Sequence, residues 1–349
     1  MTIDRAALSG TYDPILHARI RRLGDIRIQL PDGTFYRPPT FDEACEVYRT
    51  IVREAANHLQ RCGFRSVTVP ASGGADSTFM LKILRDAADL LVNEGGPSVK
   101  IFGFTLPCTL QADGEYYDDM GAWACELYAD DYATVNLGPA HAAVLDMLFE
   151  LDDIKMRKSG RTLNEAFKDI SPAYPLKEMR VDKGNVAARL RMIFAYGIAK
   201  MLGGAPCSTD NLSEGLEGFW TLCGDEGTFK YIQGVLKGLE QPLLMFAAGI
   251  PSPFYTQTET DGLGVGDGDV AQIYGELFTG KETYIEVDTV LVNMLAGREY
   301  PDPINPTVTA KDHPIVRRYW GTDFKRNIFT LGRATVGLSN LPGLTFANK

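Results

Sequence analysis

The chain is poor in the residues that build zinc and redox sites. Its 349 residues include only four histidines, and none of its six cysteines belongs to a C-x-x-C pair. A structural zinc site is therefore not expected, and the thiols are expected to be reduced. The cysteines are Cys45, Cys62, Cys108, Cys125, Cys207 and Cys223. Cys45 falls on the apolar side of a predicted helix, which favours a buried structural thiol over a reactive one.

Long apolar runs and an excess of basic residues are also missing. No stretch approaches the roughly 18 apolar residues that span a bilayer, and the first ten residues carry charge early, unlike a secretory signal. Lys and Arg number 35 against 45 Asp and Glu, a formal net charge of -10. This balance argues against a broad basic face for nucleic acid. We therefore expect a cytoplasmic protein that binds neither membrane nor nucleic acid.

The hydrophobic content of 45% and the charged content of 23% are ordinary for a globular protein. Residues 1–40 read as an N-terminal extension with a short hairpin around 26–36, and residues 41–349 as one domain. A helix is predicted from Phe41 to Gln60, with Thr40 as its N-cap, because apolar residues recur there at steps of three and four.

Strands and helices alternate after this helix. Strands are predicted at 66–70, 99–105, 132–136 and 205–208, and helices at 77–92, 114–128, from 139, and at 185–202. The polar stretch that follows the helix at 139 and runs to 184 reads as a solvated excursion. Alternation of this kind indicates an α/β fold with a doubly wound parallel sheet flanked by helices. Ligands bind such sheets at the carboxyl ends of the strands.

The strongest chemical signal is S-G-G-A-D-S, which lies between the first predicted strand and its helix. Gly73 and Gly74 allow close backbone approach to an oxyanion, and Ser72 and Ser77 supply hydroxyl groups. The start of the helix adds unpaired N–H groups, so the loop suits a pyrophosphate. Asp76 would repel that anion unless it holds Mg²⁺. The alternative is an ordinary tight turn between a strand and a helix. The segment is not a G-x-x-x-x-G-K-[ST] phosphate-binding loop, because no lysine follows the glycines.

The hexapeptide resembles the S-G-G-x-D-S loop of the ATP pyrophosphatases, a superfamily with the Rossmann-like adenine nucleotide alpha hydrolase fold. That resemblance implies cleavage of ATP to AMP and pyrophosphate and activation of a substrate by adenylation.

A second region, residues 184–227, resembles the NAD synthetase family. Three blocks carry the likeness: a helix N-x-x-A-R-x-R-M, a segment G-T-x-N-x-S-E and a segment G-[FY]-x-T-x-x-G-D. The matching residues are Asn185, Ala188, Arg189, Arg191, Met192, Thr209, Asn211, Ser213, Glu214, Gly218, Phe219, Thr221, Gly224 and Asp225, with Ser208 in place of a glycine. Leu106, Pro107 and Gln111 resemble a further family segment, and the likeness covers about residues 64–335.

The resemblance implies a role for each matching residue. The expected ATP contacts are Ser72, Gly73, Gly74, Asp76, Ser77, Thr209 and Lys237. Asp76 and Glu214 would hold Mg²⁺ and, with Lys237, form the catalytic set; Lys230 is a rival for the lysine. The expected substrate contacts are Asn185, Arg189, Asp225 and Lys325. The plainer alternatives are an ion pair for Arg189 or Arg191, solvent-facing charge for Glu214 and a turn former for Asp225.

The implied activity is that of an ATP-dependent carbon–nitrogen ligase that makes NAD. The nicotinate carboxylate of deamido-NAD attacks ATP, and ammonia then displaces AMP from the acyl adenylate. Glutamine-dependent members carry an additional amidase domain, and only about 65 residues precede the ATP domain here. Free ammonia is thus the expected nitrogen donor, unless a separate subunit delivers it, and a homodimer is expected by resemblance.

Three positions depart from the family pattern: Leu222 and Phe324 stand where a lysine and a histidine are usual, and Glu226 replaces a glycine. All three fall on the side expected for the nicotinate substrate. They keep open a related adenylating amide ligase that acts on a different carboxylate. A catalytically weak nucleotide-binding homologue and a tRNA-modifying pyrophosphatase are the less favoured hypotheses.

Overall fold

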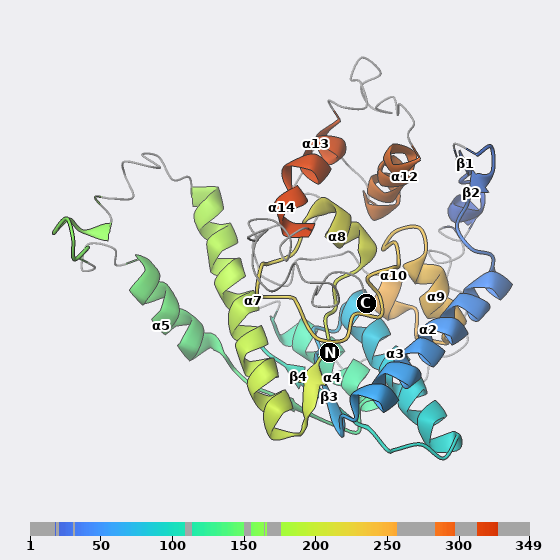
Figure 1. The fold of residues 1–349 in the computed structure, drawn as a ribbon, viewed down its shortest axis with the longest axis horizontal. Coiled ribbons are helices and arrows are strands. Elements are labelled where there is room, and N and C mark those ends of the chain that lie inside the picture. The colour runs from blue at the N-terminus through green and yellow to red at the C-terminus, as the bar shows by residue number, and fades with distance from the viewer. Residues whose placement is uncertain are drawn as a thin grey trace, which may run out of the picture.

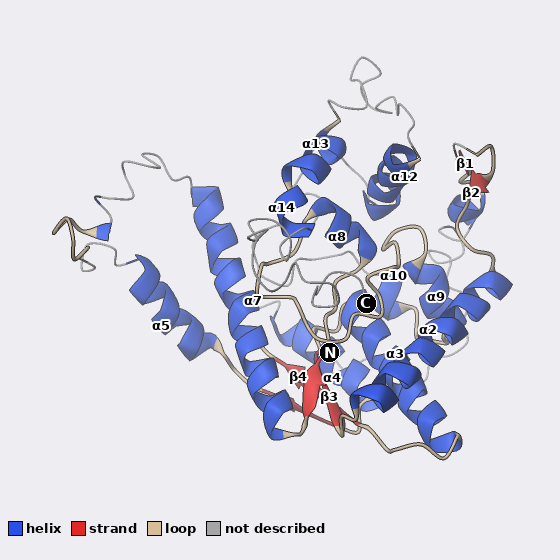
Figure 2. Cartoon of the chain, viewed as in Figure 1, coloured by secondary structure: helices blue, strands red, loops and turns tan. Residues whose placement is uncertain are grey.

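A four-stranded parallel sheet forms the base of the computed structural model (Figure 2). Its strands are β3 (Ser66–Pro70), β4 (Lys100–Thr105), β5 (Asp131–Thr134) and β6 (Gly204–Pro206), in the order β5-β4-β3-β6. In the register, Val67 pairs with Ile101 on one side and with Ala205 on the other. The chain moves outward from β3 to β5 and then returns to place β6 beside β3. The order therefore reverses between β3 and β6, and this is where a doubly wound sheet binds its ligand.

The structure describes residues 18, 21–30, 32–108, 114–149, 155–163, 165, 176–256, 283–296 and 313–326. The long helices are α2 (Phe41–Cys62), α3 (Ala75–Asn93), α4 (Gly114–Tyr128), α5 (Gly138–Phe149), α7 (Leu176–Met201) and α12 (Thr283–Leu295). The shorter ones are α8 (Leu212–Glu217), α9 (Gln241–Ala247), α10 (Pro253–Thr256), α13 (Pro314–Gly321) and α14 (Asp323–Arg326). Among these residues, no helix has the length and apolarity to cross a membrane.

Helices cover both faces of the sheet (Figure 1). On one face α3 and α4 pack against β3 and β4, where Gly103 leaves room for the side chain of Cys125. On the other face α7 packs against β3 and β6, and Phe194 meets Phe104 edge to face with ring centroids 5.6 Å apart. The expectation of an α/β sheet flanked by helices is confirmed.

The predicted hairpin is present as β1 (Ile28–Gln29) and β2 (Phe35–Tyr36), which pair antiparallel. Leu23 and Ile28 are buried in the same core as the sheet. The described part of residues 1–40 thus packs on the rest of the chain, while residues 1–17 lie outside the described residues. The division of the chain into an N-terminal extension, residues 1–40, and one domain, residues 41–349, stays a prediction.

Several element boundaries differ from those expected. Helix α3 begins at Ala75, two residues early, because Gly73 turns the chain at φ 80° and extended Gly74 is the N-cap. Helix α7 begins at Leu176 and runs through Gly184, so the polar excursion ends earlier than predicted; packing against α5 accompanies this extension. Strand β6 ends at Pro206. Cys45 is half-buried, so the prediction of a buried thiol at this position overstated its burial.

The N-cap of α2 is confirmed in full. The Thr40 side chain accepts from the backbone N–H of Glu43, and the Glu43 carboxylate accepts from the N–H of Thr40. This reciprocal capping box satisfies two donors at the helix start.

Candidate active site

The glycine loop lies at the carboxyl end of β3 and turns directly into α3. A Cβ at Gly73 would lie 2.4 Å from the backbone nitrogen of Gly121, so α4 passes immediately beside the loop. The hydroxyl groups of Ser72 and Ser77 are 3.1 Å apart. Ser72 is exposed, whereas Ser77 is buried and also bonds the carbonyl of Gly74 at 3.3 Å. The loop therefore exposes Ser72, and Ser77 holds its shape.

Asp76 occupies the first turn of α3 and points toward the segment after β6. Its Oδ1 accepts a hydrogen bond from Nδ2 of Asn211 at 3.0 Å. Asn211 is in turn the N-cap of α8, where it forms a capping box with Glu214. One amide side chain thus joins the glycine loop to the second sequence motif, across the point where the strand order reverses.

The ammonium group of Lys237 lies between the two predicted metal ligands. Its Nζ is 3.2 Å from Oδ2 of Asp76 and 2.6 Å from Oε1 of Glu214. The lysine side chain is only 7% exposed and lies over the ring of Tyr284, 4.6 Å from the centroid. Lys230, the rival lysine, is exposed. The structure thus brings Lys237, not Lys230, to the carboxylates.

Lys237 is carried by a turn, residues 236–240, whose backbone is held by side chains. Four consecutive N–H groups of this turn each donate to a side-chain oxygen. They are those of Leu236 to Glu240 (2.9 Å), of Lys237 to Ser213 (2.9 Å), and of Gly238 and Leu239 to Asp288 (2.7 and 3.1 Å). A Cβ at Gly238 would lie 2.3 Å from the backbone of Tyr284, so the turn rests directly on α12. The position of the lysine is therefore set by α8, α12 and the turn itself.

The four predicted substrate residues gather around a second segment, residues 218–225. Asn185 accepts from the hydroxyl of Thr221 at 2.7 Å, and the Thr221 N–H donates to Asp225 at 2.5 Å. Arg189 reaches the carbonyl of residue 222 at 3.1 Å. Lys325 donates to the carbonyls of residues 218 and 220 at 2.6 and 2.5 Å. In this structure these side chains fasten the segment; Arg191 instead reaches the carbonyl of residue 106.

Asp210 lies between the two groups, and the motif comparison missed it as a site residue. Ser208 donates to its carboxylate at 3.1 Å and to the carbonyl of Asp225 at 2.9 Å. Burial raises the pKa of Asp210 well above its usual value, and the charges of Asp225 and Glu214 raise it further. Burial likewise raises the pKa of Asp225, against the hydrogen bonds from Thr221. Thr209, which precedes Asp210, is half-buried beside them.

Sequence patterns also missed Asn211 and Asp288 as members of the site. Asn211 belongs to a recognised motif, and its place before the helix that carries Glu214 was an available signal. Asp288 offers no such signal, because it is one acidic residue within α12 and meets Gly238 only in the folded chain. Among the described residues, no group of three or more His, Cys, Asp or Glu side chains is arranged to hold a metal ion.

The sheet, its reversal between β3 and β6 and the glycine loop define an α/β protein with a doubly wound parallel sheet. The family described as NAD synthase matches residues 47–328, and the chain belongs to this family. The resemblance seen in the motifs is thereby confirmed.

Individual relatives agree with this assignment. The NH(3)-dependent NAD(+) synthetase of Streptomyces coelicolor is 29% identical over 297 residues, covering 83% of this chain and 91% of that protein. The enzyme of the same description from Pseudomonas aeruginosa is 29% identical over 192 residues, which span 54% of this chain and 61% of that relative, less than two thirds of its length.

Solved structures share the fold. NAD+ synthetase from Burkholderia pseudomallei matches 91% of this chain and 99% of its own, with 23% identity and a TM-score of 0.56. NMN synthetase from Francisella tularensis matches 84% and 98%, with 19% identity and a TM-score of 0.55.

Proposed function

We propose that this protein is an ammonia-dependent NAD synthetase. It would adenylate the nicotinate carboxylate of deamido-NAD with ATP and amidate the product with ammonia, giving NAD, AMP and pyrophosphate. The observation that carries the proposal is the meeting of Asp76, Glu214 and Lys237 beside the glycine loop. These residues come from three distant segments, and the family assignment and the relatives' descriptions agree with the activity.

On the ATP side, the chain offers groups for each part of a triphosphate. The backbone of the glycine loop and the first turn of α3 supply N–H donors and the positive end of the helix. Ser72 is exposed and Thr209 is half-buried, and each would offer a hydroxyl group to ATP. Lys237 brings a positive charge into a largely buried setting, where it acts more strongly on developing negative charge than it would in water. These features favour stabilisation of the departing pyrophosphate.

Asp76 and Glu214 fit a magnesium ion by their chemistry. Both are carboxylates, the oxygen ligands that Mg²⁺ prefers, and both already share one cation, the Lys237 ammonium. Two carboxylates suit an ion that takes its remaining ligands from water and phosphate. When bound, Mg²⁺ supplies charge neutralisation for the pyrophosphate.

On the acyl side, the proposal assigns the substrate to the segment fastened by Asn185, Arg189, Asp225 and Lys325. Arg189 is exposed and makes its backbone contact through Nε. The proposal places a carboxylate or phosphate of the substrate at its terminal nitrogens. Catalysis at this side would rest on positioning rather than on a covalent nucleophile. A homodimer and a cytoplasmic location complete the proposal, both from the family resemblance and the composition.

The test is a product assay with purified protein, ATP, Mg²⁺, ammonium and nicotinic acid adenine dinucleotide. NAD and AMP are expected in equal amounts, and glutamine in place of ammonium is expected to give little NAD. Asp76→Asn should abolish both products. Asp89→Asn is the matched control, because Asp89 lies on the same helix but its side chain is 57% exposed and pairs with Arg85.

A second candidate, an amide ligase for a different carboxylate, is motivated by Leu222, Glu226 and Phe324. In the structure the carbonyl of Leu222 holds Arg189, and the Glu226 carboxylate accepts from the N–H of Cys223 at 3.1 Å. Both residues therefore shape the acyl side. One neighbour in fold is described as an NMN synthetase, so nicotinic acid mononucleotide belongs in the assay. AMP formed with it and not with the dinucleotide would overturn the first candidate, and no AMP with either would overturn a role on both nicotinate substrates.

A further inference from the structure

The turn that carries Lys237 receives support from the N-terminal hairpin. The Tyr36 hydroxyl on β2 donates to Oε1 of Glu240 at 3.1 Å. The other oxygen of Glu240 accepts from the N–H of Leu236 at 2.9 Å. One carboxylate therefore links the hairpin to the residue immediately before Lys237.

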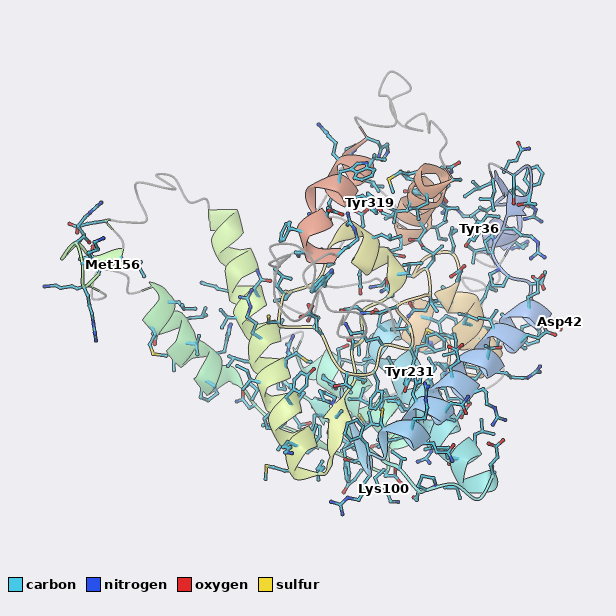
Figure 3. The ribbon with its side chains drawn as sticks, in the orientation of Figure 1. Tyr36, Asp42, Lys100, Met156, Tyr231 and Tyr319 are labelled. Carbon is cyan, nitrogen blue, oxygen red and sulfur yellow. The ribbon has the colours of Figure 1, made fainter. Side chains whose placement is uncertain are left out.

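The hairpin is itself fixed to the helix that supports the other side of this turn. Strand β1 of the hairpin contacts α12. Arg22, which precedes the hairpin in the chain, pairs with Glu286 of α12 at 3.3 Å. Figure 3 places Tyr36 on the hairpin beside α12. This helix supplies Asp288 to the turn and Tyr284 to the lysine side chain. The hairpin thus reaches the Lys237 turn both directly and through α12.

The setting keeps Tyr36 in the role of donor. Burial raises the pKa of its phenol, and the carboxylates of Glu240 and Asp288 raise it further. Burial also raises the pKa of Glu240, against the hydrogen bonds from Leu236 and Tyr36. A half-buried hydrogen bond of this kind is made at the expense of water, so its loss leaves Glu240 poorly solvated.

We propose that Tyr36 is a positioning residue for the ATP side of the site, which it serves by holding Glu240 and, through it, the backbone that places Lys237. The proposal rests on the proposed function. Tyr36 precedes residues 47–328, the part of the chain that matches the family.

The first test compares Tyr36→Phe with Tyr48→Phe by backbone hydrogen exchange. Tyr48 is the matched control. Its hydroxyl, on α2, also donates to a carboxylate, that of Asp86 on α3, at 2.8 Å. Tyr36→Phe is expected to speed exchange of the amides of residues 236–240 about threefold to tenfold, as loss of one hydrogen bond implies. Tyr48→Phe should leave these amides at the wild-type rate. Unchanged exchange in Tyr36→Phe overturns the proposal.

The second test measures kcat and the KM for ATP. Tyr36→Phe is expected to lower kcat/KM for ATP about threefold to tenfold, and Tyr48→Phe to leave it within about twofold of the wild type. In a Lys237→Met background the Tyr36 effect should vanish, because the group it positions is gone. Equal losses in both tyrosine variants, or an undiminished Tyr36 effect without Lys237, would show a purely structural role.

The two proposals fail in different ways. Wild-type protein that forms no AMP with any nicotinate substrate refutes the proposed function, whereas the exchange experiment needs no substrate. Wild-type exchange at residues 236–240 in Tyr36→Phe refutes the role of Tyr36 alone, even when NAD is formed.

Discussion

Glu217→Gln should make the stability of this protein less sensitive to a rise in pH. Glu217 lies on α8, one turn beyond Glu214, and is only 2% exposed. Among the described residues, neither of its carboxylate oxygens has a hydrogen-bond partner. Burial raises its pKa from 4.5 to about 8, against the nearby positive charges of Arg318 and Arg326. The folded protein therefore keeps this carboxyl protonated at neutral pH.

The size and sign of the effect follow from that shift. Because the folded pKa lies above the unfolded value, the contribution of Glu217 to stability is fully present below about pH 4.5 and is lost as the pH rises through about 8. Each pKa unit corresponds to about 1.4 kcal/mol. Between pH 5 and pH 8 this group alone should lower the free energy of unfolding by about 3 kcal/mol, an order-of-magnitude figure. Glutamine has a similar shape but does not titrate in this pH range, so it removes the pH dependence that comes from this position.

The assay is urea unfolding at pH 5, 6, 7 and 8, followed by tryptophan fluorescence, to which buried Trp123 contributes. The variant and the wild type should be of similar stability at pH 5, and the variant should gain about 3 kcal/mol over the wild type by pH 8. Glu54→Gln, at an exposed position on α2, is the control and should show no such trend. A stability difference between Glu217→Gln and the wild type that stays constant with pH would refute the reasoning.

Three further substitutions probe the loop and the two sides of the site. Gly73→Ala should lower the free energy of unfolding by about 3 kcal/mol or more, because the residue has positive φ and the added Cβ would meet the backbone of α4. Gly63→Ala is the control. Gly63 also has positive φ but faces open space, so the loss should be only about 1–2 kcal/mol in the same urea assay. Lys237→Met should lower kcat about 100-fold or more, while Lys230→Met stays within about twofold, as steady-state AMP release would show. Lys325→Met should raise the KM for the nicotinate dinucleotide about tenfold and leave the KM for ATP unchanged. The substitution removes the hydrogen bonds that hold the carbonyls of residues 218 and 220. Equal changes in both KM values would contradict this.

Local patterns were sufficient for most of the elements and for the place of the glycine loop between a strand and a helix. The capping of α2 by Thr40, the strand at 66–70 and the glycine loop are each encoded within a few neighbouring residues. Boundaries were less accurate where backbone geometry decided them. Ser77 resembles an N-cap by its hydroxyl group, yet the turn at Gly73 starts α3 two residues earlier and places Asp76 in the helix.

The sequence by itself determined the α/β class and the family, and it predicted the residues of the proposed ATP side. Only the tertiary structure decided which of those residues meet. Asp76 and Glu214 share Lys237 because β6 returns to lie beside β3, and no local pattern records that strand order. Asp288 and Tyr36 join the site through contacts that span 50 and 204 residues. Periodicity and capping act over a few residues, whereas such contacts exist only after the whole core has packed.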